Sequence, residues 1–466
     1  MDDAKYNEII GSPGFCAYPF VQVSTVPAGF MRPCCFFTDI LKNDDGSSAN
    51  VDKNNFQTIW NNKNFKSIRN DMLSSTKVNG CLQCHKEDSF GGDSMRKRSL
   101  REWTWRQDFK EMVKHALNND GTLESGIKFL ELKPGNLCNL KCRMCNQFDS
   151  SKYASELQEI GAKFNKTASQ ARLFENYTFE YDFDLGKMAD WTNNKQIWES
   201  FQNLAPQIEI LSFAGGEPTL IEDVYKSLKY CVEKDLAKNI TVYFASNFTQ
   251  KMSKFIDLAQ HFKRFDFIAS IDGTEQTQEY IRFPSKWSVV ESNFRDVNRG
   301  AAHYKNVNLM INLTLNIYNV LNFIDLLHWL EDDAFRPGLK EDPFNLNILM
   351  FPNYLSLELL PNNLRPAAIE KINNYLQTSW ICKEKPHIHA RLVQLVEMLG
   401  KNESVTENNF KLLKEFWIYT KILDQSRKQK LKDTLPSLYI EVEKLLTDNN
   451  FNFAESYEKY QITEQI

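Results

Sequence analysis

From residue 127 onward, short runs of β-branched and aromatic residues alternate with longer stretches that have helical periodicity. Six runs predict strands, all between residues 127 and 351: IKFLELKP, IEILSFAGG, ITVYFASN, FDFIASID, NLMINLTLN and FNLNILMF. Intervening segments such as IEDVYKSLKYCVEKDL and NFIDLLHWLEDD repeat apolar residues every three or four positions, as one face of a helix does. This alternation predicts an α/β architecture with a parallel sheet, which can close into a barrel.

The unusual residues of this region follow the predicted strands directly. Three cysteines come after the first run, GGEP after the second, SN after the third and SID after the fourth. In barrels of parallel strands, catalytic groups lie at the C-terminal ends of the strands. The sequence therefore predicts that these four segments contribute to one site.

The rest of the chain lies outside this alternation. Residues 1–95 are rich in turn-formers and punctuated by cysteines, which predicts a small module that depends on a metal for its shape. Residues 96–126 predict an amphipathic linker helix, and residues 127–360 the α/β domain, with a long aromatic and acidic insertion at 148–207. Residues 361–466 predict a helical region, which like the insertion could cover the mouth of a barrel.

Charge and cysteine content narrow the range of partners. The net charge of −4 gives no general attraction to a polyanion. The N-terminal MDDAKYNEII has no apolar signal core, and no apolar run approaches the length that spans a bilayer. We therefore expect a cytoplasmic protein with no membrane partner, whose thiols stay reduced. In that setting ten cysteines indicate metal binding or catalysis before disulfides, although the isolated Cys231 and Cys382 are expected to be small buried hydrophobes.

The run LCNLKCRMCNQ places Cys138, Cys142 and Cys145 close together, with no histidine nearby. Thiolates hold iron–sulfur clusters, and a four-iron cluster takes one ligand per iron. Three cysteines leave one iron free for a substrate or cofactor, as open catalytic metal sites do. Structural zinc is the alternative, although it favours two separated cysteine pairs over three cysteines in one tight loop.

The C-x3-C-x2-C loop after one strand and GGEP after the next together resemble the radical S-adenosylmethionine (SAM) superfamily, over roughly residues 127 to 351. The resemblance implies a partial (β/α)6 barrel and a four-iron cluster on the three cysteines, whose free iron is chelated by SAM. In that family one electron from the cluster cleaves SAM, and a 5′-deoxyadenosyl radical abstracts hydrogen from the substrate. It also implies an electron donor such as flavodoxin or ferredoxin.

The same resemblance implies a set of contacts to SAM. The implied residues are Met144, Gly215, Gly216, Glu217, Pro218, Ser246, Asn247, Ser270, Asp272 and Arg282. The glycines would permit close backbone approach to the SAM amino group, and a guanidinium would suit the SAM carboxylate. Met144 stands where the family often has an aromatic residue. For the polar members, turn or cap formation is the alternative role.

The first 85 residues carry a second set of cysteines, at positions 16, 34, 35, 81 and 84. The set resembles the twitch domain, a half-size relative of the SPASM domain of radical SAM enzymes, which holds one auxiliary four-iron cluster. Here the domain precedes the barrel, whereas it usually follows it. The implied ligands are Cys16, Cys34, Cys81 and Cys84, with Cys35 as the competitor of Cys34. Zinc is the alternative, because CxxC pairs suit zinc well.

The substrate is the least specified feature. Twitch and SPASM enzymes often modify peptides or proteins, so a peptide or protein residue is the expected substrate. A nucleotide or nucleic-acid base is the alternative, because KRSLREWTWR (97–106) interleaves arginines with Trp103 and Trp105, which can grip phosphates and stack bases. The same run is also compatible with an ordinary solvated helix face. A non-catalytic scaffold that holds clusters or zinc is a third interpretation.

Metal content distinguishes these interpretations. With two 4Fe–4S clusters, the anaerobically reconstituted chain is expected to hold about eight irons and negligible zinc. About four irons with one zinc would make the N-terminal module a structural zinc site. Mainly zinc with little iron would contradict the radical interpretation. Elemental analysis per chain provides the measurement.

Overall fold

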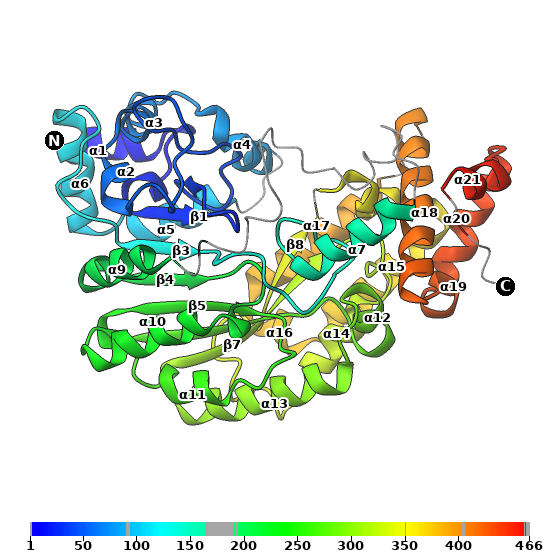
Figure 1. The fold of residues 1–466 in the computed structure, drawn as a ribbon. Coiled ribbons are helices and arrows are strands. Elements are labelled where there is room, and N and C mark those ends of the chain that lie inside the picture. Colours follow the sequence, from blue (N-terminus) through cyan, green and yellow to red (C-terminus); the bar gives the residue numbers. More distant parts are fainter. Residues whose placement is uncertain are drawn as a thin grey trace. The chain divides into compact units, whose positions relative to one another are not determined.

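The computed structural model describes residues 2–89, 94–163, 191, 194–349, 351–401, 406–460 and 462. Its strands form one sheet of eight, in the order β2-β1-β3-β4-β5-β6-β7-β8 (Figure 1). The strands are β1 (Gln22–Thr25), β2 (Met31–Arg32), β3 (Phe129–Leu132), β4 (Ile210–Phe213), β5 (Thr241–Ser246), β6 (Arg264–Ser270), β7 (Val307–Leu315) and β8 (Phe344–Ile348). Because β2 and β8 stand at opposite ends of this order, the sheet is open.

The six predicted strands are all present, as β3 to β8. β3 pairs in parallel with β4, β4 with β5, and β7 with β8. Their β-branched and aromatic side chains suit a sheet that is buried on its faces, and helices connect the parallel strands, as such connections require. The predicted α/β class is therefore confirmed.

Two strands come from the N-terminal module. β1 pairs in parallel with β3, with Ser24 opposite Glu131, and β2 pairs antiparallel with β1. The sequence predicted six strands, all between residues 127 and 351, and did not predict these two. β2 has only two residues, and β1 (QVST) has one apolar residue where the equally short β3 (FLEL) and β4 (ILSF) have three, so neither strand stood out in the sequence.

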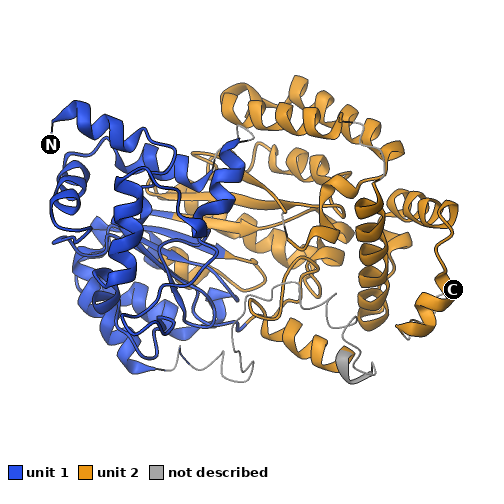
Figure 2. Cartoon of the chain, turned by 90° about the horizontal axis from the view of Figure 1, so that it is seen from above, with its two compact units in different colours: residues 1–137, 184–245, 258–265 blue, residues 138–183, 246–257, 266–466 orange. Residues whose placement is uncertain are grey.

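The chain divides into two compact units (Figure 2). The first comprises residues 1–137, 184–245 and 258–265, and the second residues 138–183, 246–257 and 266–466. The first unit holds α1 (Asp3–Ile10), α2 (Phe56–Trp60), α3 (Lys63–Leu73), α4 (Leu82–Ser89), α5 (Met95–Trp103), α6 (Gln107–Asn118), α9 (Lys195–Leu204) and α10 (Glu222–Glu233). The second holds α7 (Ser151–Lys163), α12 (Glu275–Ile281), α13 (Trp287–His303), α14 (Phe323–Leu330), α15 (Arg365–Thr378), α16 (Trp380–Glu384), α17 (Pro386–Leu399), α18 (Glu407–Arg427), α19 (Leu431–Thr434), α20 (Pro436–Asp448) and α21 (Phe453–Lys459). Helix α11 (Ser253–Ala259) lies across the division.

The predicted linker helix is two helices, α5 and α6, separated at residues 104–106. Arg106 has an extended backbone, and the hydroxyl of Tyr6 donates to the Thr104 carbonyl, 2.6 Å away. Thr104 is the C-cap of α5, and carbonyls at a helix C-terminus have no amide donor within the helix. The break buries Trp103 and leaves Trp105 79% exposed, so the two indoles do not lie on one face.

The C-terminal region is helical, as predicted, from α15 to α21. Its longest helix, α18, begins after the N-cap Thr406, whose side chain accepts from the amide of Asn409. It ends at Lys428, which has a left-handed backbone. Of the predicted insertion at 148–207, residues 164–190 and 192–193 lie outside the described residues. None of the helices in the described ranges has both the length and the apolar character that a bilayer crossing needs.

A buried arginine, Arg69 on α3, ties the N-terminal module together. Its Nε donates to the Pro19 carbonyl at 2.8 Å, and its Nη1 donates to Asn61 at 3.0 Å and to the Gly121 carbonyl at 3.1 Å. Its guanidinium also lies 4.3 Å from the ring centre of Trp60. One side chain thus links four segments of the first unit.

We expect Arg69→Met to lower the free energy of unfolding by about 3 kcal/mol, because buried carbonyls lose their donors. A denaturant titration followed by tryptophan fluorescence measures this loss. The exposed Lys77→Met on the following loop is the control and is expected to change stability little. Equal midpoints for the two variants would contradict the anchoring role of Arg69.

Candidate functional site

The three predicted cluster cysteines lie in one group within the second unit, in which Cys138 and Cys142 are buried and Cys145 is partly buried. Cys138 and Cys142 are each 8% exposed and pack with Leu140, and Met144 and Cys145 lie against them. The Leu140 amide donates to the Cys138 Sγ at 3.4 Å, and the Arg282 Nη1 lies 4.0 Å from the Cys142 Sγ. Burial raises the pKa of Cys142 and, more strongly, that of Cys145. Protons must therefore leave these thiols when they bind metal.

The backbone of the cysteine loop is fixed on both sides of Cys142. The amide of Lys141 donates to the Phe283 carbonyl at 2.7 Å, and the amide of Arg143 donates to the Ile281 carbonyl at 2.8 Å. Two serines at the start of α7 hold the beginning of the loop: Ser151 accepts from the Cys138 amide at 3.2 Å, and Ser150 donates to the Leu140 carbonyl at 2.5 Å. An irregular loop thus has its polar backbone groups satisfied.

The GGEP segment lies in the first unit and packs on the residues that lead into the cysteine loop. Gly215 and Gly216 have φ of +72° and +52°. A Cβ on Gly215 would lie 2.7 Å from the Lys133 Cβ, and one on Gly216 would lie 2.7 Å from the Leu137 carbonyl oxygen. The Glu217 amide donates to that same carbonyl at 2.8 Å. The glycines therefore allow the segment to approach Leu137, the residue before Cys138.

Glu217 and Pro218 begin a short 3-10 helix, Pro218–Leu220. The Glu217 Oε1 accepts from the Thr219 amide at 3.1 Å and from its hydroxyl at 2.6 Å. Glu217 is 1% exposed. In this structure the carboxylate therefore acts as a cap.

Ser246 and Asn247 build the turn after β5. The Ser246 Oγ accepts from the Phe248 amide at 3.1 Å, and the Asn247 Oδ1 accepts from the Thr249 amide at 3.0 Å. The Asn247 Nδ2 also donates to the Asn139 Oδ1 at 2.9 Å, and the Asn139 Nδ2 donates to the Thr249 hydroxyl at 2.7 Å. Asn139 follows Cys138 directly. These polar groups therefore connect the β5 turn to the cysteine loop.

Asp272 and Arg282 form a buried ion pair next to Cys142. The Asp272 Oδ2 accepts from the Arg282 Nε at 2.5 Å, and its Oδ1 accepts from the Thr314 amide at 2.8 Å. Burial alone would lower the pKa of Arg282, but the Asp272 carboxylate and the Cys142 thiol outweigh it and hold that pKa above its usual range. Asp272 is fully buried, whereas Ser270 at the end of β6 is partly exposed. A permanent cation therefore lies beside one of the three sulfurs.

The N-terminal cysteines also gather, within the first unit. Burial, and then the neighbouring Cys35, Cys16, Cys81 and Cys84, raise the pKa of Cys34 well above its usual value. Burial likewise raises the pKa of Cys84 to about 12. Four thiols thus lie within electrostatic range of Cys34.

Cys35 has a different environment from Cys34. After burial, the largest influence on its pKa is the nearby Glu131 carboxylate, which raises that pKa. Glu131 is on β3 and accepts from the Gln22 Nε2 at 3.0 Å. The Cys35 side chain is therefore directed to the sheet. This arrangement favours Cys34 as the metal ligand.

Sequence reasoning missed several contact residues, including Ser99. Its hydroxyl lies 3.3 Å from the Cys16 Sγ and accepts from the Ala17 amide at 3.1 Å. It also missed the charged residues that hold the cysteine loop: Lys141, Arg143, Glu156, Asp424 and Arg427. Charges at such separations along the chain carry no pairing signal in a single sequence.

The three-cysteine loop fits a four-iron cluster. Among the described residues, no three His, Cys, Asp or Glu side chains converge as they would on a single metal ion. A cluster spreads its ligands over separate irons, so it does not require that convergence. Three thiols in one group, with a guanidinium beside one sulfur, suit an anionic cluster with an open position.

Comparison with known proteins supports the N-terminal prediction. Residues 16–85 match the SPASM family, an iron-sulfur cluster-binding domain. This match confirms the predicted auxiliary cluster domain. No curated protein matches the chain.

Solved structures show only a distant likeness. Streptococcus suis SuiB bound to precursor peptide SuiA is 14% identical over 66% of this chain and 64% of that chain, with a TM-score of 0.34. SuiB bound to S-adenosylmethionine is 14% identical over 68% and 64%, also at 0.34. TYW1 with a lysine-pyruvate adduct is 14% identical over 53% and 72%, at 0.28. The match thus spans 64% of the SuiB chains, and TM-scores this low assign neither fold nor activity.

We expect Gly216→Ala to destabilise the chain more than Gly46→Ala. Gly46 also has a positive φ, but a Cβ there meets nothing within 4 Å, so it reports backbone strain alone. The added contact with the Leu137 carbonyl should cost about 2 kcal/mol beyond that strain. Denaturant unfolding of both variants gives the difference. Equal losses would show that the close approach at Gly216 has no energetic weight.

Proposed function

We propose that this chain is a radical SAM enzyme with an auxiliary iron–sulfur cluster. It uses a 4Fe–4S cluster on Cys138, Cys142 and Cys145 to cleave SAM and abstracts hydrogen from a peptide or protein residue. The observation that carries the proposal is the group of three thiols, two buried and one partly buried, with no fourth protein ligand in its motif. The SPASM match at residues 16–85 supports it independently.

The chain's own residues would bind and orient these groups. Cys138, Cys142 and Cys145 would hold the cluster, which would supply the one-electron reduction that SAM cleavage needs. Arg282 places a fixed positive charge beside the Cys142 sulfur, and Asp272 holds that guanidinium in place. Two turns carry proposed SAM contacts. The turn at residues 215–218 packs on Leu137, and the turn with Ser246 and Asn247 hydrogen-bonds to Asn139. Movement of the cysteine loop would thus disturb the proposed SAM contacts at Ser246 and Asn247 as well.

Cys16, Cys34, Cys81 and Cys84 are the proposed ligands of the auxiliary cluster. The interaction of Cys35 with Glu131 supports its exclusion from that set. Four protein ligands leave no free iron. The auxiliary cluster therefore serves electron transfer or structural support in this proposal.

A peptide or protein remains the proposed substrate. The run at residues 97–106 is weaker support for a nucleic-acid base than the sequence suggested. Trp103 is buried, and Arg106 pairs with Asp108 and Glu209, both at 2.8 Å. A paired guanidinium and a buried indole are poorly placed to bind phosphate and base. A reducing cytoplasm with a flavodoxin or ferredoxin as electron donor completes the proposal.

The anaerobically loaded and reduced chain is expected to release 5′-deoxyadenosine from SAM, as measured by chromatography. Cys142→Ala should lower that release at least tenfold, because the cluster loses one of its three ligands. Cys382→Ala, which removes a buried thiol from α16 of the same unit, is the matched control and should retain release. If the wild-type chain releases no more than a blank, the scaffold interpretation replaces the enzyme.

A further inference from the structure

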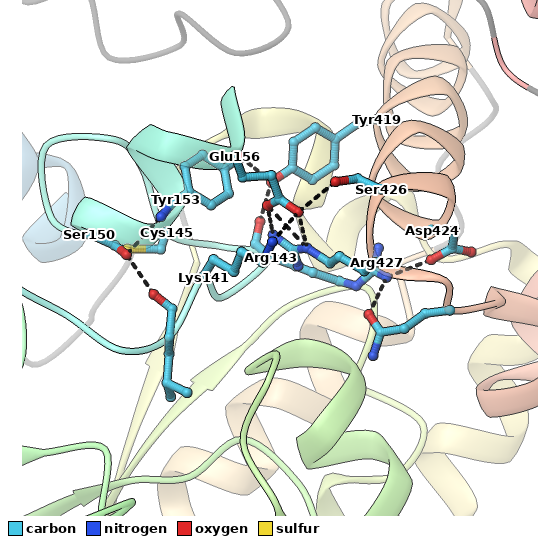
Figure 3. Close-up of polar contacts among 12 residues, drawn as sticks. Lys141, Arg143, Cys145, Ser150, Tyr153, Glu156, Tyr419, Asp424, Ser426 and Arg427 are labelled. Atoms are coloured by element: carbon cyan, nitrogen blue, oxygen red, sulfur yellow. Dashed lines mark hydrogen bonds and ion pairs between the residues drawn. The ribbon is translucent and has the colours of Figure 1, made fainter. Parts of the chain in front are cut away.

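The last turn of helix α18 contacts the cysteine loop through a buried ion pair (Figure 3). The Arg143 Nη2 lies 2.5 Å from the Asp424 Oδ1 and also donates to the Gln429 Oε1 at 3.0 Å. The side chain of Arg143 is 0% exposed and that of Asp424 is 6% exposed. The Asp424 Oδ2 accepts from the Leu431 amide at 2.7 Å, so this carboxylate is itself held in place.

A second buried pair lies three residues further along α18. The Arg427 Nη2 donates to the Glu156 Oε2 at 2.7 Å, and both side chains are 0% exposed. Glu156 is on α7, and its Oε1 also pairs with the Lys141 Nζ at 2.9 Å. The Glu156 carboxylate thus lies between Lys141 of the loop and Arg427 of α18, as Figure 3 shows.

A neutral contact joins the same elements. The Tyr419 hydroxyl donates to the Arg143 carbonyl at 2.6 Å and lies 2.7 Å from the Tyr153 hydroxyl. Tyr280 donates to the Asp424 Oδ1 at 2.8 Å, and its ring centre lies 3.6 Å from the Arg143 guanidinium. Arg143 therefore has its side chain and its carbonyl both bound to α18.

The contacts with α18 involve the two residues that flank Cys142 in the sequence. Lys141 and Arg143 are the two neighbours of Cys142, and their amides are bound to the carbonyls of Phe283 and Ile281. The Arg143 side chain pairs with Asp424, which belongs to α18. The Lys141 side chain pairs with Glu156, which α18 holds through Arg427. The Cys142 sulfur instead lies beside Arg282. The loop is thus attached on both sides of one proposed ligand.

Stability alone is a weak explanation for these contacts. Burying charged groups removes them from water, and apolar residues of similar size often give equal or greater stability. A buried charge pair does fix geometry, because a shift of either partner leaves a charge without compensation. An open cluster site needs that precision, since its ligands must hold a set geometry without a fourth protein ligand.

We propose that the last turn of α18 is a positioning element for the three-cysteine loop, in which Asp424 holds Arg143 and Arg427 holds Lys141 through Glu156. The C-terminal helical region is then part of the cluster site and not only a cover over it. This inference rests on the proposed function in that it assigns the loop to a cluster. The attachment itself is a property of the chain without metal.

The first test compares Asp424→Asn with the wild type by hydrogen exchange of residues 138–147, in the full chain without metal. We expect loop amides to exchange at least tenfold faster in the variant, because Arg143 loses its charged partner. Arg365→Met is the matched control, since Arg365 is a buried arginine of the same unit that binds the carbonyls of Leu360 and Lys401. It should lower the melting temperature and leave loop exchange within twofold of wild type. Unchanged loop exchange in Asp424→Asn would overturn the proposal.

A double variant, Arg143→Gln with Asp424→Asn, separates positioning from stability. It removes both charges, so no unpaired cation remains buried. If the pair only stabilises the fold, the double variant regains both the wild-type melting temperature and wild-type loop exchange, which would contradict the proposal. Under the proposal it regains the melting temperature and keeps the fast exchange.

The loaded chain gives a third measurement. In Asp424→Asn the SAM-dependent change in the electron paramagnetic resonance spectrum of the reduced chain should be at least tenfold weaker than in wild type, whereas the signal that does not respond to SAM should persist. A full SAM-dependent change would contradict the positioning role. If the wild-type chain itself shows no such change, the proposed function fails, while the exchange experiment still decides whether α18 holds the loop.

Discussion

The attachment of an irregular, buried loop that carries three thiols is the constraint on which the second unit depends. Such a loop has no regular ladder to satisfy its amides and carbonyls, and an unpaired polar group away from water is costly. Here the Ile281 and Phe283 carbonyls, two serines of α7 and Tyr419 of α18 provide the partners. Three separate stretches of chain are therefore arranged around residues 138–145.

The N-terminal module has a related problem with a different solution. It is small and rich in turns, and β1 and β2 join it to the sheet next to β3. Arg69 links three of its segments to one another and to Gly121, and Ser99 joins α5 to the first cysteine. A module with few regular elements thus depends on buried polar contacts and on the proposed cluster, because its apolar core is limited.

The adjacent cysteines at 34 and 35 show how one motif can contain two roles. Their sequence context is almost the same, but the chain bends and turns at these two residues, so their side chains meet different groups. Cys34 faces the other N-terminal thiols and Cys35 faces Glu131. The effect of a substitution at Cys34 or Cys35 therefore depends on the group that the cysteine faces, and not on its place in the motif.

The sequence alone determined the α/β class, the six strands β3 to β8 and the helical C-terminal region, because apolar periodicity and strand length are local properties. It also determined the three-cysteine loop, since ligand spacing is local. Only the tertiary structure decided that β1 and β2 extend the sheet and that a break follows Trp103. It also decided that Asp424 meets Arg143 and that Arg427 meets Glu156, the partner of Lys141. Those contacts join residues nearly 300 positions apart, and a single sequence records which charges exist but not which of them burial forces together.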